Sequence, residues 1–143
     1  MKKSVYLFTT LFLFLSLFIN AQQHQNSHSN CDTTTTGRTI KFNGSSDVEA
    51  IIINVSEDTK IAEIAVNTTI KSGHLTVEIH DPKGNKKGNF SVESLIKSSE
   101  KKSELVCGQM HKQISDPKAG KWIVHLIPKN VSGEVTIQTF MSN

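Results

Sequence analysis

Four side chains in the second half of the chain could ligate a metal ion or transfer a proton: Glu78, His80, His111 and His125. If residues 74–80 form a β-strand, Glu78 and His80 point to the same face about 7 Å apart. They could then bind a borderline metal such as Zn²⁺, provided that a neighbouring strand added His111 or His125. Because the sequence does not reveal strand pairing, this metal site stands as an alternative to ordinary polar residues on the outer face of a sheet.

Signatures of common catalytic sites are absent from the sequence. It contains no Gly-x-Ser-x-Gly elbow, no His-Glu-x-x-His zinc motif and no glycine-rich phosphate loop. The segment 107–111, CGQMH, matches no cysteine-hydrolase signature. We therefore predict no catalytic residues and no cofactor.

The two cysteines, Cys31 and Cys107, are 76 positions apart. In an oxidising compartment an even number of cysteines favours a disulfide over a metal site or a nucleophile. The chain-entropy model assigns a loop of that length about 4 to 5 kcal/mol of stabilisation. We expect Cys31 and Cys107 to form a bond whose role is stability.

The N-terminus has the form of a bacterial secretory signal. Lys2 and Lys3 precede an apolar run at 5–19, and Ala21 is a small residue at the expected cleavage point. The run is shorter than the roughly 20 residues of a spanning helix. We predict a signal peptide at 1–21, no transmembrane segment in the mature form, and export to the periplasm or the exterior.

Composition separates a tether from a domain. Residues 22–37 contain no Val, Ile, Leu or Phe, so they cannot bury themselves, and we expect a flexible polar tether there and one domain at 38–143. Loss of Lys2 and Lys3 with the leader lowers the formal net charge from +3 to +1. This charge gives no reason to expect a nucleic-acid partner.

From Thr39 onward, apolar residues recur with a period of two between turn-forming residues, which is typical of antiparallel strands with one buried face. In one such strand Trp122, Val124 and Leu126 form the inner set, so we expect Trp122 to anchor the core. About eight strands at this spacing predict an all-β, antiparallel, jelly-roll-like β-sandwich. Their expected ranges are 39–42, 48–55, 61–68, 74–80, 90–95, 105–114, 122–127 and 134–140.

Two similar turns separate these strands. In each, Asp caps the turn, Pro sets the next φ and Gly accepts a positive φ. The residues are Asp81, Pro82 and Gly84 in the first turn, and Asp116, Pro117 and Gly120 in the second.

The segments SGHLTVEIHDPKG at 72–84, DPKAGKWIV at 116–124 and SGEVTI at 132–137 carry a family resemblance. Their order resembles the bacterial pre-peptidase C-terminal domain and, more distantly, the proprotein convertase P domain. That resemblance implies a secreted β-sandwich module, although no peptidase domain accompanies it in this chain. We therefore predict a secreted, non-enzymatic accessory module that binds a protein, a glycan or another cell-envelope component. The alternative is a small secreted metal-binding or hydrolytic protein that uses its surface histidines.

Overall fold

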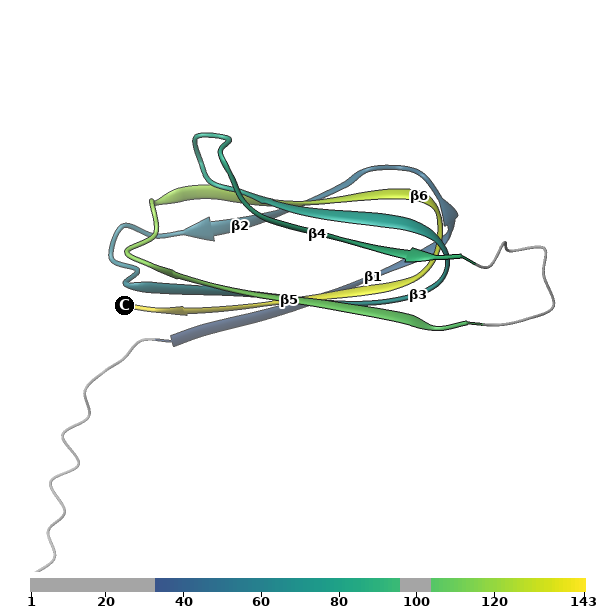
Figure 1. Cartoon of the computed structure of the whole chain (residues 1–143). Helices are drawn as coiled ribbons and strands as arrows, with labels where there is room; N and C mark the ends of the chain where they lie inside the picture. The colour runs from purple at the N-terminus through teal and green to yellow at the C-terminus, as the bar shows by residue number, and fades with distance from the viewer. Residues whose placement is uncertain (1–32, 96–103) are drawn as a thin grey trace, which may run out of the picture. The chain divides into compact units, whose positions relative to one another are not determined.

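The computed structural model describes residues 33–95 and 104–143. The expected signal peptide, Cys31 and residues 22–32 of the expected tether lie outside these ranges. The described residues form six strands and no helix, so none of them belongs to a helix that could span a membrane. The strands are β1 (Thr33–Ser45), β2 (Glu49–Val55), β3 (Ile61–His80), β4 (Lys86–Ser94), β5 (Val106–Ser115) and β6 (Gly120–Ser142) (Figure 1).

The two long strands, β3 and β6, bend and so belong to two layers. In what we call the first layer, β1 pairs with residues 131–142 of β6. That part of β6 also pairs with residues 61–70 of β3, and the same part of β3 pairs with β5. In the second layer, β2 pairs with residues 120–126 of β6, residues 123–129 of β6 pair with 74–80 of β3, and β4 pairs with 73–80 of β3. Every pairing is antiparallel, so the prediction of an antiparallel β-sandwich is confirmed.

Each bent strand can be counted as two segments, which gives eight segments in chain order. The first layer then has the order 1-8-3-6 and the second layer the order 2-7-4-5, which is the arrangement of a jelly roll. Two of the expected strand boundaries are wrong: the one between the third and fourth strands, and the one between the seventh and eighth. The chain continues through both points as a strand, without a separating loop.

Two glycines explain why the strands bend there. Gly73 has φ +86, and a Cβ at this position would overlap the carbonyl oxygen of Asn130. Gly133, with φ +154, lies equally close to the backbone of Thr69. The register of β3 against β6 shifts on both sides of Ser72. The backbones of β3 and β6 therefore touch at the bend, where only glycine has the space and the conformational freedom required.

The core lies between the layers and follows the alternation seen in the sequence. Trp122 is only 2% exposed and packs in this core. The largest fully buried side chains come mainly from the inner faces of β3 and β6: Ile64, Val66, Ile70, Leu75, Val77, Ile79, Val124, Leu126, Val131 and Val135.

The first strand is longer than the sequence indicates. Residues 33–37, which the composition places in the polar tether, are paired with residues 138–142 of β6. Cross-strand hydroxyl contacts account for part of this pairing, since Thr36 Oγ1 lies 2.6 Å from Thr139 Oγ1. Threonine is a good strand former even where it buries little apolar surface.

Candidate functional site

The outer face of the second layer brings together three of the four expected metal ligands. Glu78 on β3 lies directly opposite His125 on β6. His80 Nε2 lies 3.0 Å from Glu78 Oε2, and the rings of His80 and His125 meet edge to face with centroids 5.1 Å apart. Lys86 Nζ donates to the other oxygen of Glu78.

The electrostatics of this cluster favour the charged form of the Glu78 carboxylate. The hydrogen bond from Lys86, followed by that from His80, lowers the pKa of Glu78 below its ordinary value. The Lys86 ammonium, itself a cation, already contacts Glu78 Oε1. Among the described residues, no group of three His, Cys, Asp or Glu side chains has a geometry that could hold a metal ion.

His111 is not part of this cluster. It lies on β5 in the first layer, opposite Ala65, and its Nε2 is 3.3 Å from Glu63 Oε2. The two layers of the sandwich therefore separate it from His80 and His125. The expected combination of His80, His111 and His125 around one ion does not occur in this structure.

An aliphatic strip borders the histidines on the same outer face. Ile52 on β2 is 55% exposed and lies opposite Ile123, and Ile123 lies opposite His80. Val48, just before β2, is 59% exposed, and Ile127 is half-buried. We call Val48, Ile52, Ile123 and Ile127 the aliphatic strip. The alternation in the sequence places Ile123 and Ile127 on this face, but the run Ile51-Ile52-Ile53 hides the fact that its middle residue points outward.

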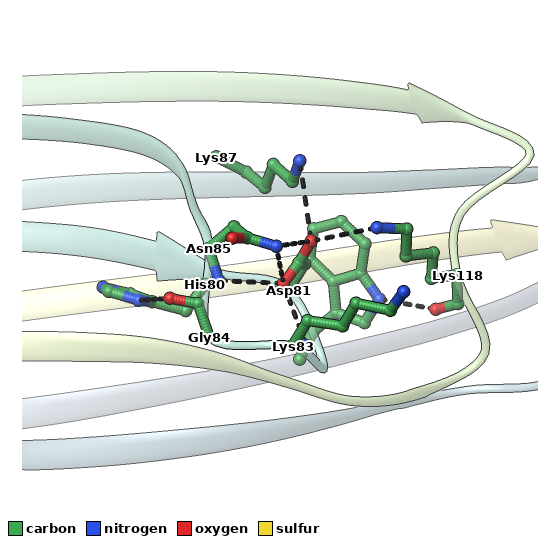
Figure 2. A network of polar contacts seen from close by, with 8 residues as sticks. His80, Asp81, Lys83, Gly84, Asn85, Lys87 and Lys118 are labelled. Carbon is green, nitrogen blue, oxygen red and sulfur yellow. Dashed lines mark hydrogen bonds and ion pairs between the residues drawn. The ribbon is translucent and has the colours of Figure 1, made fainter.

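The two similar turns meet at one end of the sandwich, around Asp81 (Figure 2). Asp81 is 2% exposed, and its Oδ1 accepts hydrogen bonds from the backbone N–H groups of Lys83 and Asn85, each at 2.9 Å. The side-chain amide of Asn85 donates to both carboxylate oxygens. Lys87 and Lys118 point toward Oδ2 at 3.5 and 3.6 Å.

This network holds Asp81 as a charged carboxylate. The hydrogen bond from the Asn85 side chain is the main cause that lowers the pKa of Asp81 far below its ordinary value, and backbone N–H donors add to it. Beside Asp81, the indole Nε1–H of Trp122 donates to the carbonyl oxygen of Lys118 at 2.8 Å. Trp122 thus joins the core to the second turn.

The other residues of the two turns contribute to backbone geometry and packing. Gly84 has φ +81 and Gly120 has φ +124, with Gly120 close to the Pro82 ring. Asp116 has φ +47, and its backbone N–H donates to the carbonyl oxygen of Lys60 at 2.7 Å. Pro117 is buried.

Cys107 is an exposed thiol on β5, 3.9 Å from Thr69 Oγ1. The register places Thr33 level with Ser115 at the opposite edge of the first layer. Cys107 is eight positions along β5 from Ser115, about 26 Å at strand rise, and three strand spacings add about 14 Å sideways. Two extended residues before Thr33 reach only about 7 Å. The expected bond between Cys31 and Cys107 therefore stays a prediction, and it requires about three residues of β1 to leave the sheet.

Comparison with known proteins finds low similarity. No family and no curated protein matches the sequence. Among solved structures, a disulfide-linked pilus protein of Bacillus endospore appendages is 12% identical, covering 77% of this chain and 88% of that one, with a TM-score of 0.43. The carbohydrate-binding module CBM6cm-2 of Cellvibrio mixtus lichenase 5A is 13% identical, covering 80% and 88%, with a TM-score of 0.37. The propeptide form of Bacillus licheniformis lipase BlEst2 is 16% identical, covering 93% of this chain but 27% of that one, with a TM-score of 0.44. These values are too low to identify a family, a ligand or an activity.

Proposed function

We propose that the chain is an exported, non-enzymatic binding module that contacts a protein of the cell envelope through the outer face of its second layer. The observation that supports this proposal is the aliphatic strip, in which Ile52 lies exposed beside Ile123 and next to the polar cluster of Glu78, His80 and His125. Apolar side chains gathered on a surface and bordered by polar groups are typical of protein interaction sites.

The shape of the face also favours a protein partner. It is formed by paired antiparallel strands, so its side chains stand in regularly spaced rows. The row Ile52, Ile123 and His80 runs across three strands, and the row Ala50, His125 and Glu78 runs beside it. An exposed surface that sets apolar side chains beside polar ones is typical of surfaces that contact another protein.

The test is photo-crosslinking in intact cells with a photoreactive amino acid at position 52. The matched control carries it at Gln138, which is exposed on the outer face of the first layer. We expect one discrete adduct from position 52, its loss in an Ile123→Glu background, and no such adduct from position 138. Equal labelling from both positions, or none from position 52, contradicts the proposal.

An alternative is a metal-dependent activity at Glu78, His80 and His125, which would require these side chains to rearrange around the ion. Its test is the metal content of the purified mature protein. A stoichiometric transition metal that is lost in a His125→Ala variant, and retained in His111→Ala, would replace the proposed function with this alternative.

A further inference from the structure

A cavity of about 330 Å³ lies between the layers at the end where the two Asp-Pro turns meet. β4 and β5 contribute to its walls, and its apolar lining comes from Ile114, Pro117 and Trp122. It lies beside β4 and β5, whereas the aliphatic strip lies on β2 and β6. The cavity is thus separate from the face proposed above as the protein-binding surface.

Three lysines from three different elements line this cavity: Lys87 on β4, Lys112 on β5 and Lys118 in the second turn. Two carboxylates, Asp81 and Asp116, also line it. The formal charge of the lining is therefore positive by one unit. The lysines come from segments far apart in the sequence, so their gathering is a property of the fold.

The ammonium groups keep hydrogen-bonding capacity for a ligand. Lys87 and Lys118 lie 3.5 and 3.6 Å from Asp81 Oδ2, which is longer than an N–H···O hydrogen bond of about 2.7 to 3.2 Å. Lys112 forms no ion pair with any residue that the structure describes, although it is half-buried on the inner side of β5. Lys87 and Lys118 therefore share one acceptor, Asp81 Oδ2, and each lysine ammonium in the lining has further N–H donors for a ligand.

Asp81 faces Lys87 and Lys118 with its Oδ2. Its Oδ1 is saturated by the backbone N–H groups of Lys83 and Asn85 and by the Asn85 side chain. Its fixed negative charge instead attracts Lys87 and Lys118 toward each other, which lowers their mutual repulsion before any ligand arrives. A second anion placed among the lysines gains charge-assisted hydrogen bonds.

We propose that this cavity binds a small organic anion, with its carboxylate among Lys87, Lys112 and Lys118 and an apolar ring or chain against Ile114 and Pro117. The lysines account for the charge, and the apolar lining accounts for the body, because a bare hydrated ion gains nothing from burying those side chains. Trp122, the only tryptophan in the chain, borders the cavity and reports occupancy through its fluorescence.

The experiment titrates the mature protein with cyclohexanecarboxylate and follows Trp122 emission. Cyclohexanecarboxamide is the neutral isostere that tests the charge, and acetate is the anion that lacks the apolar body. We expect saturable binding of cyclohexanecarboxylate that weakens with added salt, and binding at least about tenfold weaker for both comparison compounds.

The variants are Lys112→Gln and the matched control Lys83→Gln. Lys83 is exposed on the first turn, and its side chain does not line the cavity. We expect Lys112→Gln to weaken binding about tenfold and Lys83→Gln to change it by less than about twofold. Lys118→Gln provides a second variant if Lys112→Gln unfolds at a lower temperature than the wild type.

Four outcomes overturn the proposal: no saturation by cyclohexanecarboxylate, equal binding of the neutral isostere, equal binding of acetate, or equal losses in the Lys112→Gln and Lys83→Gln variants. The first three show that the cavity does not select both a charge and an apolar body. The last shows a general charge effect rather than a site.

Discussion

Three glycine-to-alanine variants test whether contact between β3 and β6 defines the bend of the sandwich. Gly73 and Gly84 have nearly the same backbone conformation, with φ of +86 and +81. They differ in their surroundings, because a Cβ on Gly73 would overlap the backbone of Asn130, whereas one on Gly84 would meet no atom within 4 Å. Gly37 has an ordinary φ and equally open space, so Gly37→Ala is the baseline.

The expected costs follow from these differences. An L-residue forced into a left-handed conformation costs about 1 to 2 kcal/mol, which is the whole effect expected for Gly84→Ala. Gly73→Ala adds the displacement of two packed backbones, for which overpacking values of about 1 to 3 kcal/mol are a guide. We expect a total of about 3 kcal/mol or more, with a fall in Tm of about 10 °C or more for a domain of this size. Gly37→Ala should lie within about 0.5 kcal/mol of the wild type.

The assay is urea unfolding followed by far-UV circular dichroism and by Trp122 fluorescence. Agreement of the two probes establishes that a single free energy of unfolding describes each variant. If Gly73→Ala and Gly84→Ala lose the same stability, the backbone contact at Asn130 contributes nothing, and our explanation of the bend is wrong.

Four further predictions follow from the same structure. Trp122→Ala should lower the free energy of unfolding by about 3 to 5 kcal/mol in urea melts, because it empties a buried site, and a variant that melts like the wild type would contradict this. The folded-state pKa of Asp81 is depressed from 3.8, so its stabilisation is present above that pH and is lost as the pH falls toward the folded pKa. Asp81→Asn should therefore flatten the acid limb of stability measured below about pH 4. If Cys31 and Cys107 are bonded in the oxidised monomer, hydrogen exchange should find the amides of residues 33–35 unprotected. Finding the bond together with protected amides would refute the register argument. Mass spectrometry of the exported protein should find Gln22 as its first residue, and retention of Met1 would refute cleavage.

The sequence predicts the β-sandwich class and the inner faces of the strands well, because both depend on a local period of two. The segments around Leu75 and Trp122 alternate clearly, so their buried sides are correct without knowledge of their partners. Whether β3 and β6 continue as strands through their bends cannot be predicted from the local sequence. Ser72-Gly73 and Ser132-Gly133 are the same dipeptide, which in other settings ends a strand and begins a turn. Only the pairing of β3 with β6 on both sides of the bend determines that the strands continue.

The candidate site also depends on which strands pair, which is a long-range property of the chain. Whether Glu78 meets His125 or His111 is decided by which strands lie beside β3 in the second layer, and these strands are β4 and β6. His111 is equally polar, and the sequence pattern places it on an outer face as well. It belongs to the first layer because β5 pairs with the first half of β3. Residue types thus predict the candidates, and topology selects among them.

The two Asp-Pro turns show how topology also gives a second role to residues whose local role is already clear. β3 ends at His80, which lies opposite Ile123 near the start of β6. The turn after β3 and the turn before β6 are therefore neighbours in space, although more than thirty residues separate them in the sequence. In consequence Lys118, from the second turn, pairs with Asp81 of the first turn. Each turn reverses its own part of the chain, and together they form a wall of the cavity proposed to bind an anion.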